Sequence, residues 1–86
     1  MNYGRTMIQV EHSTNMKNYR ATKFYKSLNS YMACAIAEGF CEGEGATETE
    51  QLTAWQYIWD KGMWKGLQGW YGRTVHSLIE SEMIKK

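Results

Sequence analysis

Apolar residues recur at intervals of three and four over the second half of the chain, which is the spacing of one face of an α-helix. One such stripe predicts a helix over 47–64, and a second predicts a helix over 70–84. The first stripe consists of Leu52, Trp55, Trp59 and Met63, with Tyr57 on the opposite side. The second consists of Tyr71, Val75, Leu78, Ile79 and Met83.

An earlier amphipathic stretch predicts one continuous helix over 22–38. Its apolar stripe consists of Phe24, Leu28, Tyr31, Met32, Ala35 and Ile36, whereas Ala33 faces away. The following segment GFCEGEG contains three glycines, which suit a helix C-cap and a turn. We expect Phe40 in this segment to fold back over the end of the core.

Two local signals indicate where the second helix begins and ends. Thr47 and Glu50 have the spacing of a capping box, in which each side chain binds the backbone N–H of the other residue. Gly62 and Gly66 each weaken a helix by about 1 kcal/mol relative to Ala. The helix should therefore stop between Gly62 and Leu67, with Gln68-Gly69 as the connection to the next helix.

The N-terminal residues 1–20 have no helical pattern and are interpreted as an arm, followed by a helical domain over 21–86. Ile8 and Val10 would share one face of a short strand within residues 5–12. A single strand needs a partner, which a second protomer would have to supply. The alternative is an irregular arm lying on the helices. Either way, the sequence predicts a small all-α domain of three main helices.

Part of the C-terminal half resembles a segment of small tailed-bacteriophage proteins of undescribed function. The shared residues follow the pattern L-Q-G-x-Y-G-R-T, here Leu67 to Thr74, and continue to L-I-E at 78–80. The resemblance implies a phage origin. Trp59 replaces an aliphatic residue of the pattern, and Glu82 replaces a glycine. Because Glu82 is not a helix breaker, we expect the last helix to run further than in those proteins.

The charge of the chain is small in total and uneven in distribution. The 86 residues are 43% hydrophobic and carry a net charge of +1, which argues against both a polyanion-binding protein and an acidic mimic of DNA. Residues 38–60 nevertheless hold six acidic and no basic residues. This segregation either guides the choice of a partner or reflects a solvated acidic loop and helix start.

The sequence offers little that could carry catalysis or hold a metal. Cys34, Cys41, His12 and His76 lack the spacing of a zinc site. Seven residues apart on a helix, the two cysteines would be about 10 Å apart, so we expect free thiols. We predict a protein that is not an enzyme and has no cofactor. No apolar segment has the length of a signal peptide core or a membrane span, which suggests the cytoplasm of an infected host.

One hypothesis for function is nucleic-acid binding. Two helices joined through Gln68-Gly69 have the outline of a helix-turn-helix, and the second would present Trp70, Arg73, Thr74 and Ser77 outward. Arg73 could contact a guanine edge. A single arginine followed by Glu80 and Glu82 is, however, a weak electrostatic match to DNA.

The leading hypothesis is an interaction protein that binds and modulates or inhibits a host component, such as a defence protein, or another phage protein. Four tryptophans and six tyrosines are many for the core of so short a chain, and Trp, Tyr and Arg are enriched at interface hot spots. The predicted partner-binding residues are Trp64, Trp70, Arg73 and Tyr57. The same surplus, with the unpaired N-terminal segment, predicts a homo-oligomer, most simply a dimer.

Overall fold

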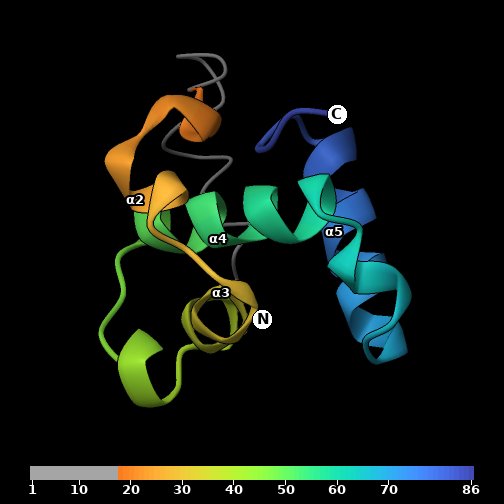
Figure 1. Ribbon diagram of the computed structural model, residues 1–86. Coiled ribbons are helices and arrows are strands. Elements are labelled where there is room, and N and C mark those ends of the chain that lie inside the picture. The colour runs from red at the N-terminus through yellow and green to blue at the C-terminus, as the bar shows by residue number, and fades with distance from the viewer. Residues whose placement is uncertain (1–17) are drawn as a thin grey trace.

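The computed structural model describes residues 18–86 and contains an all-α domain (Figure 1). Within these residues there are four α-helices, three short 3-10 helices and no strand. The α-helices are α2 (Lys23–Lys26), α3 (Ser30–Glu38), α4 (Glu48–Asp60) and α5 (Gly69–Glu80). The 3-10 helices are η2 (Tyr19–Ala21), η3 (Cys41–Gly43) and η4 (Met63–Lys65). The predicted strand within 5–12 lies outside the described residues, as does most of the predicted arm over 1–20. Tyr19 and Arg20, predicted in that arm, lie in η2 and pack against α4.

Helix α4 is the centre of the domain, with α3, α2 and α5 arranged around it (Figure 1). Its start is the predicted capping box: the Thr47 N–H donates to the Glu50 carboxylate at 2.9 Å, and the Glu50 N–H donates to the Thr47 hydroxyl at 3.1 Å. The helix ends at Asp60, earlier than predicted, because Gly62 adopts a left-handed conformation (φ +68°) and starts the turn into η4.

The buried surface of α4 is wider than the single stripe that the sequence predicts. Leu52 and Trp55 are buried as expected, but Trp59 and Met63 are half-buried. The residues buried beyond the stripe are Thr53, Ala54, Gln56 and Ile58. A helix with neighbours on several sides must bury most of its circumference, which explains the difference.

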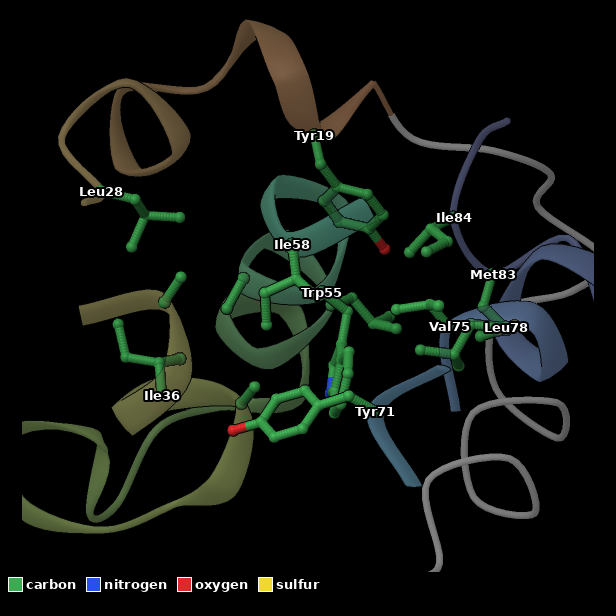
Figure 2. Close-up of a cluster of buried hydrophobic side chains, with 14 residues drawn as sticks. Tyr19, Leu28, Ile36, Trp55, Ile58, Tyr71, Val75, Leu78, Met83 and Ile84 are labelled. Atoms are coloured by element: carbon green, nitrogen blue, oxygen red, sulfur yellow. The ribbon is translucent and has the colours of Figure 1, made fainter. Parts of the chain in front are cut away.

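The core is built around Trp55, whose side chain is fully buried. Figure 2 shows this ring beside Tyr71 of α5, and Ile58, Tyr19 and Ile84 belong to the same buried cluster. Ala33, Ala37 and Ala54 are also fully buried. These small side chains suit a close approach of α3 to α4, the pair of helices with the most extensive contact.

The predicted continuous helix over 22–38 is wrong, because the chain breaks at residues 27–29. The Ser27 hydroxyl donates to the Phe24 carbonyl at 2.8 Å, and the Asn29 side chain caps α3 by accepting from the Met32 N–H at 2.8 Å. Such short polar side chains compete with helical hydrogen bonds. The break turns α3 so that Ala33 is buried and Tyr31 is exposed, the reverse of the prediction.

The last helix also ends earlier than predicted. α5 stops at Glu80, and Glu82 takes a left-handed conformation (φ +62°), so the expected extension to residue 84 is wrong. The Met83 N–H donates to the Leu78 carbonyl at 2.9 Å, which closes the helix end. This reversal brings Met83 and Ile84 into the core (Figure 2). Their burial offsets the cost of a left-handed residue other than glycine, about 1–2 kcal/mol.

A polar network at the C-terminal end of α4 joins three segments of the chain. Arg20 binds Asp60 through two hydrogen bonds of 2.8 Å, and the Tyr25 hydroxyl donates to the same carboxylate at 2.6 Å. The amide of Gln56, which is 1% exposed, donates to the Lys85 carbonyl at 2.8 Å and accepts from the Lys85 N–H at 2.7 Å. The network therefore fixes η2, α2 and the C-terminal segment to α4.

The pKa values in this network follow from burial and hydrogen bonding. Burial alone would raise the pKa of Asp60, but the hydrogen bonds from Arg20 and Tyr25 outweigh it and hold this pKa below its ordinary value. Burial, with the hydrogen bond to Asp60, raises the pKa of Tyr25 to about 12. The carboxylate is thus held ionised and the phenol protonated.

Asp60→Asn should lower the free energy of unfolding by about 1–2 kcal/mol at neutral pH. This is at the low end for charged hydrogen bonds, because Arg20 is 38% exposed and solvent screens the pair. Since the folded-state pKa is depressed, the contribution is present above the unfolded pKa of about 3.9 and is lost as the pH falls through the folded value. Chemical denaturation from pH 6 to about pH 2 should show that the unfolding free energy declines less steeply with falling pH for the variant than for the wild type. A decline equal to that of the wild type would contradict this role.

Gly43→Ala should strongly destabilise the domain. A Cβ at this position would lie 2.0 Å from the Ala35 carbonyl oxygen and 2.5 Å from the Ile36 Cα, both of them backbone atoms. Overpacking of this kind costs about 1–3 kcal/mol or more. Gly66→Ala is the matched control, because its Cβ would meet nothing within 4 Å and its φ is negative. A thermal melt in which both variants behave alike would refute the close packing of η3 on α3.

Candidate protein-interaction surfaces

The four predicted partner-binding residues occupy four different environments. Trp64 packs with Trp59 and His76, Trp70 packs with Trp55 and Tyr71, and Tyr57 pairs with Tyr25. Arg73 is exposed on α5. The ring contacts of the described residues therefore do not join Trp64, Trp70 and Tyr57 into one group.

Trp64 belongs to a set of three half-exposed or exposed rings, Trp59, Trp64 and His76, which we term the tryptophan–histidine cluster. The two indoles are stacked, with centroids 5.5 Å apart and planes 6° apart. The His76 ring stands edge-on to both, at 5.6 and 4.9 Å. Lys65 lies over the Trp64 ring with its Nζ 5.6 Å from the centroid. Lys65 is exposed, so its amine stays in contact with water while it lies over the ring.

The backbone around this cluster explains how the rings come together. The left-handed Gly62 turns the chain so that η4 carries Trp64 back toward Trp59 at the end of α4. On α5, a Cβ at Gly72 would lie 3.6 Å from the Trp64 ring, so glycine leaves the ring ample room. The Nδ1 of His76 hydrogen-bonds the Gly72 carbonyl at 2.8 Å, which orients the imidazole.

Trp70 is placed differently from the prediction, which left it off both apolar stripes. Its ring is edge-on to the buried Trp55 at 5.9 Å and lies 4.4 Å from the Tyr71 ring. The cations that lie over aromatic rings in residues 18–86 are Lys61 and Lys65, so Arg73 does not stack on the neighbouring Trp70 ring. The first turn of α5 directs Trp70 toward α4 because the connection through η4 brings the two helices into contact.

Tyr57 is half-buried and packs with Tyr25 of α2, at 5.6 Å between centroids. Lys61 lies over its ring at 5.5 Å. The prediction that Tyr57 faces away from the core is therefore only partly met, because α2 covers one side of it. Sequence periodicity within α4 gave no signal for this contact, which depends on the break that separates α2 from α3.

A second surface was missed by the sequence analysis. Tyr31 is 53% exposed and Phe40 is 41% exposed, and they are the exposed large hydrophobic residues of the described chain. Tyr31 was predicted on the apolar stripe, and Phe40 was predicted to fold back over the end of the core. The Tyr31 hydroxyl donates to the Glu42 carboxylate at 2.7 Å, which joins the start of α3 to η3. We call Tyr31, Phe40 and Glu42 the acidic aromatic surface. In the sequence, the glycines that flank this loop could have indicated this surface, because they permit the loop to return close along α3.

The hydrogen bond between Tyr31 and Glu42 shifts the pKa values of both groups. It raises the pKa of Tyr31 to about 12 and lowers the pKa of Glu42 below its ordinary value. Glu42 therefore carries its negative charge throughout the physiological range. The ion pair found within residues 18–86 is Arg20–Asp60, so Glu42 has no Lys or Arg partner in that part of the chain.

The cysteines and histidines do not converge in the described residues. Both cysteines are free, as predicted: Cys34 is half-buried and Cys41 is exposed. Burial raises the pKa of the Cys34 thiol. No group of three or more metal-ligating side chains occurs within residues 18–86. His12, considered as a ligand from the sequence, lies outside them.

Comparison with known proteins found no matching family model, no similar curated protein and no similar solved structure. Among residues 18–86, no helix has the length and apolar character needed to cross a membrane. Function is therefore inferred from the surfaces described above.

Trp70→Ala should destabilise the domain by about 1–3 kcal/mol, less than the 3–5 kcal/mol of a fully buried tryptophan. The reason is the loss of its contacts with Trp55 and Tyr71. Arg73→Ala, on the exposed side of the same helix, should change the unfolding free energy by less than about 0.5 kcal/mol. Urea denaturation of both variants measures the difference. If Trp70→Ala leaves the unfolding free energy unchanged, the Trp70 ring is not a core residue and is again a candidate for partner binding.

Proposed function

We propose that this protein is a non-catalytic interaction protein of phage origin that binds and modulates or inhibits a protein of the bacterial host. The observation that carries the proposal is the tryptophan–histidine cluster, where two stacked indoles remain partly exposed beside Lys65. Large rings of this kind contribute much binding energy at little cost in conformational entropy. The phage origin rests on the resemblance of residues 67–80 to proteins of tailed phages.

The chemistry of the cluster supports binding rather than catalysis. His76 is held by the Gly72 carbonyl and by contacts with two indoles, and its partners are not nucleophiles or acids. The strongly coupled polar groups Asp60, Arg20 and Tyr25 bind one another and fasten the fold. Asp60, Tyr25 and His76 are therefore engaged in structural contacts.

A second copy of the chain is an alternative occupant of the same cluster, in line with the predicted dimer. A two-fold axis would bring two tryptophan–histidine clusters together as a self-complementary patch. Nucleic-acid binding has less support. Trp70 packs against Trp55 rather than facing outward, so Arg73 is the main group left for base contact on the proposed recognition helix.

Trp64→Ala should abolish most partner binding while the domain stays folded. Truncating a hot-spot aromatic costs about 2 kcal/mol or more of binding, about thirtyfold in affinity. The loss of stacking on Trp59 and of partial burial should lower the unfolding free energy by about 1–3 kcal/mol, and a melting curve checks that the variant is folded. The measurement is capture from lysate of a susceptible host by the tagged wild type and variant, followed by titration with the captured protein.

Two lysine variants provide the matched control. Lys65→Ala alters the cluster, whereas Lys61→Ala alters the equivalent amine over Tyr57. Binding should weaken for Lys65→Ala and persist for Lys61→Ala. Equal capture by Trp64→Ala and the wild type would refute the cluster as the binding site. Light scattering at the same concentrations distinguishes a second copy from a host protein.

A further inference from the structure

The acidic aromatic surface is assembled by the return of the chain along α3. Gly43 is buried against the backbone of Ala35 and Ile36, which places η3 beside α3. The Phe40 N–H donates to the Ala35 carbonyl at 3.1 Å and ends the helix. Glu42 then lies within 2.7 Å of the Tyr31 hydroxyl. These contacts hold Glu42 of η3 beside the exposed Tyr31 ring of α3, and the exposed Phe40 is the N-cap of η3.

The segment of the chain that forms η3 and its flanks carries charge of one sign. Residues 38–60 contain six acidic and no basic residues. Of these, Asp60 is neutralised by Arg20. Glu38, Glu42 and Glu44 are exposed and have no Lys or Arg within ion-pair distance in the described part of the chain. Exposed aromatic rings in an uncompensated negative field are complementary to a cation.

We propose that the acidic aromatic surface is a docking site for a basic, arginine-containing segment of a partner protein. A guanidinium group can form two parallel hydrogen bonds with the Glu42 carboxylate while its plane lies on the Tyr31 ring. The Phe40 ring supplies apolar contact for the aliphatic part of the same or a neighbouring side chain. Glu38 and Glu44 attract the rest of a basic segment.

This surface is separate from the tryptophan–histidine cluster. Figure 1 shows η3, in yellow-green, on the side of the domain away from η4 and α5. The two surfaces also differ in charge, because Lys65 accompanies the indoles and Glu42 accompanies Tyr31. The basic docking site therefore does not depend on the function proposed for the tryptophan–histidine cluster.

The test is a titration of the full chain with three labelled peptides in which glycine alternates with arginine, lysine or glutamate. Fluorescence anisotropy at low salt should give the tightest binding for the arginine peptide and none for the glutamate peptide. Backbone amide shifts in ¹H–¹⁵N spectra should move at residues 31 and 40–44. Glu42→Gln and Tyr31→Ala should each weaken binding of the arginine peptide about tenfold.

Glu80→Gln is the matched control, since it removes the same charge from the exposed side of α5 and should change affinity by less than about twofold. Melting curves should show all three variants folded. If Glu80→Gln and Glu42→Gln weaken peptide binding equally, the peptide is attracted by the overall charge and not by this surface, which would overturn the proposal. The proposal would also be overturned if the arginine peptide does not bind. The same holds if a second copy, or another part of the same chain, covers the Tyr31 ring in the free protein.

Discussion

The carboxylate of Asp60 is the interaction on which the arrangement of the domain depends. It lies at the C-terminal end of α4, where the negative end of the helix dipole disfavours an anion. Arg20 overcomes this cost through a bidentate contact, which requires η2 to lie against α4. Because Gln56 and Lys85 exchange two further hydrogen bonds nearby, both ends of the described chain are attached to the same turn of the central helix.

Fastening the chain at this point allows a small core to enclose a large ring. Trp55 contacts Tyr71 and Trp70 of α5, and Ile84 of the C-terminal segment belongs to the same buried cluster. The C-terminal segment reaches the core only because Glu82 reverses the chain after α5. The polar network and the apolar core are thus coupled, since the same C-terminal segment contributes to both.

The aromatic residues that remain accessible are divided between two surfaces of opposite charge. The stacked Trp59 and Trp64 have Lys65 beside them, whereas Tyr31 is bonded to Glu42. In both surfaces a short 3-10 element, η4 or η3, returns along a helix and meets a ring that the helix carries. In each case a glycine permits the return: Gly62 by its left-handed conformation and Gly43 by its lack of a Cβ. The surfaces therefore depend on the turns as well as on the helices.

The sequence by itself determined the features that depend on neighbouring residues: the capping box of α4, the inward face of α5 at Val75 and Leu78, and the all-α class. It could not determine which ring is exposed, because that depends on which helix meets which face. Only the tertiary structure decided that Tyr31 is exposed and that Gln56 is buried. The break at residues 27–29 changed the orientation of α3, and burial of Gln56 required the distant backbone of Lys85, a partner that no local pattern reveals.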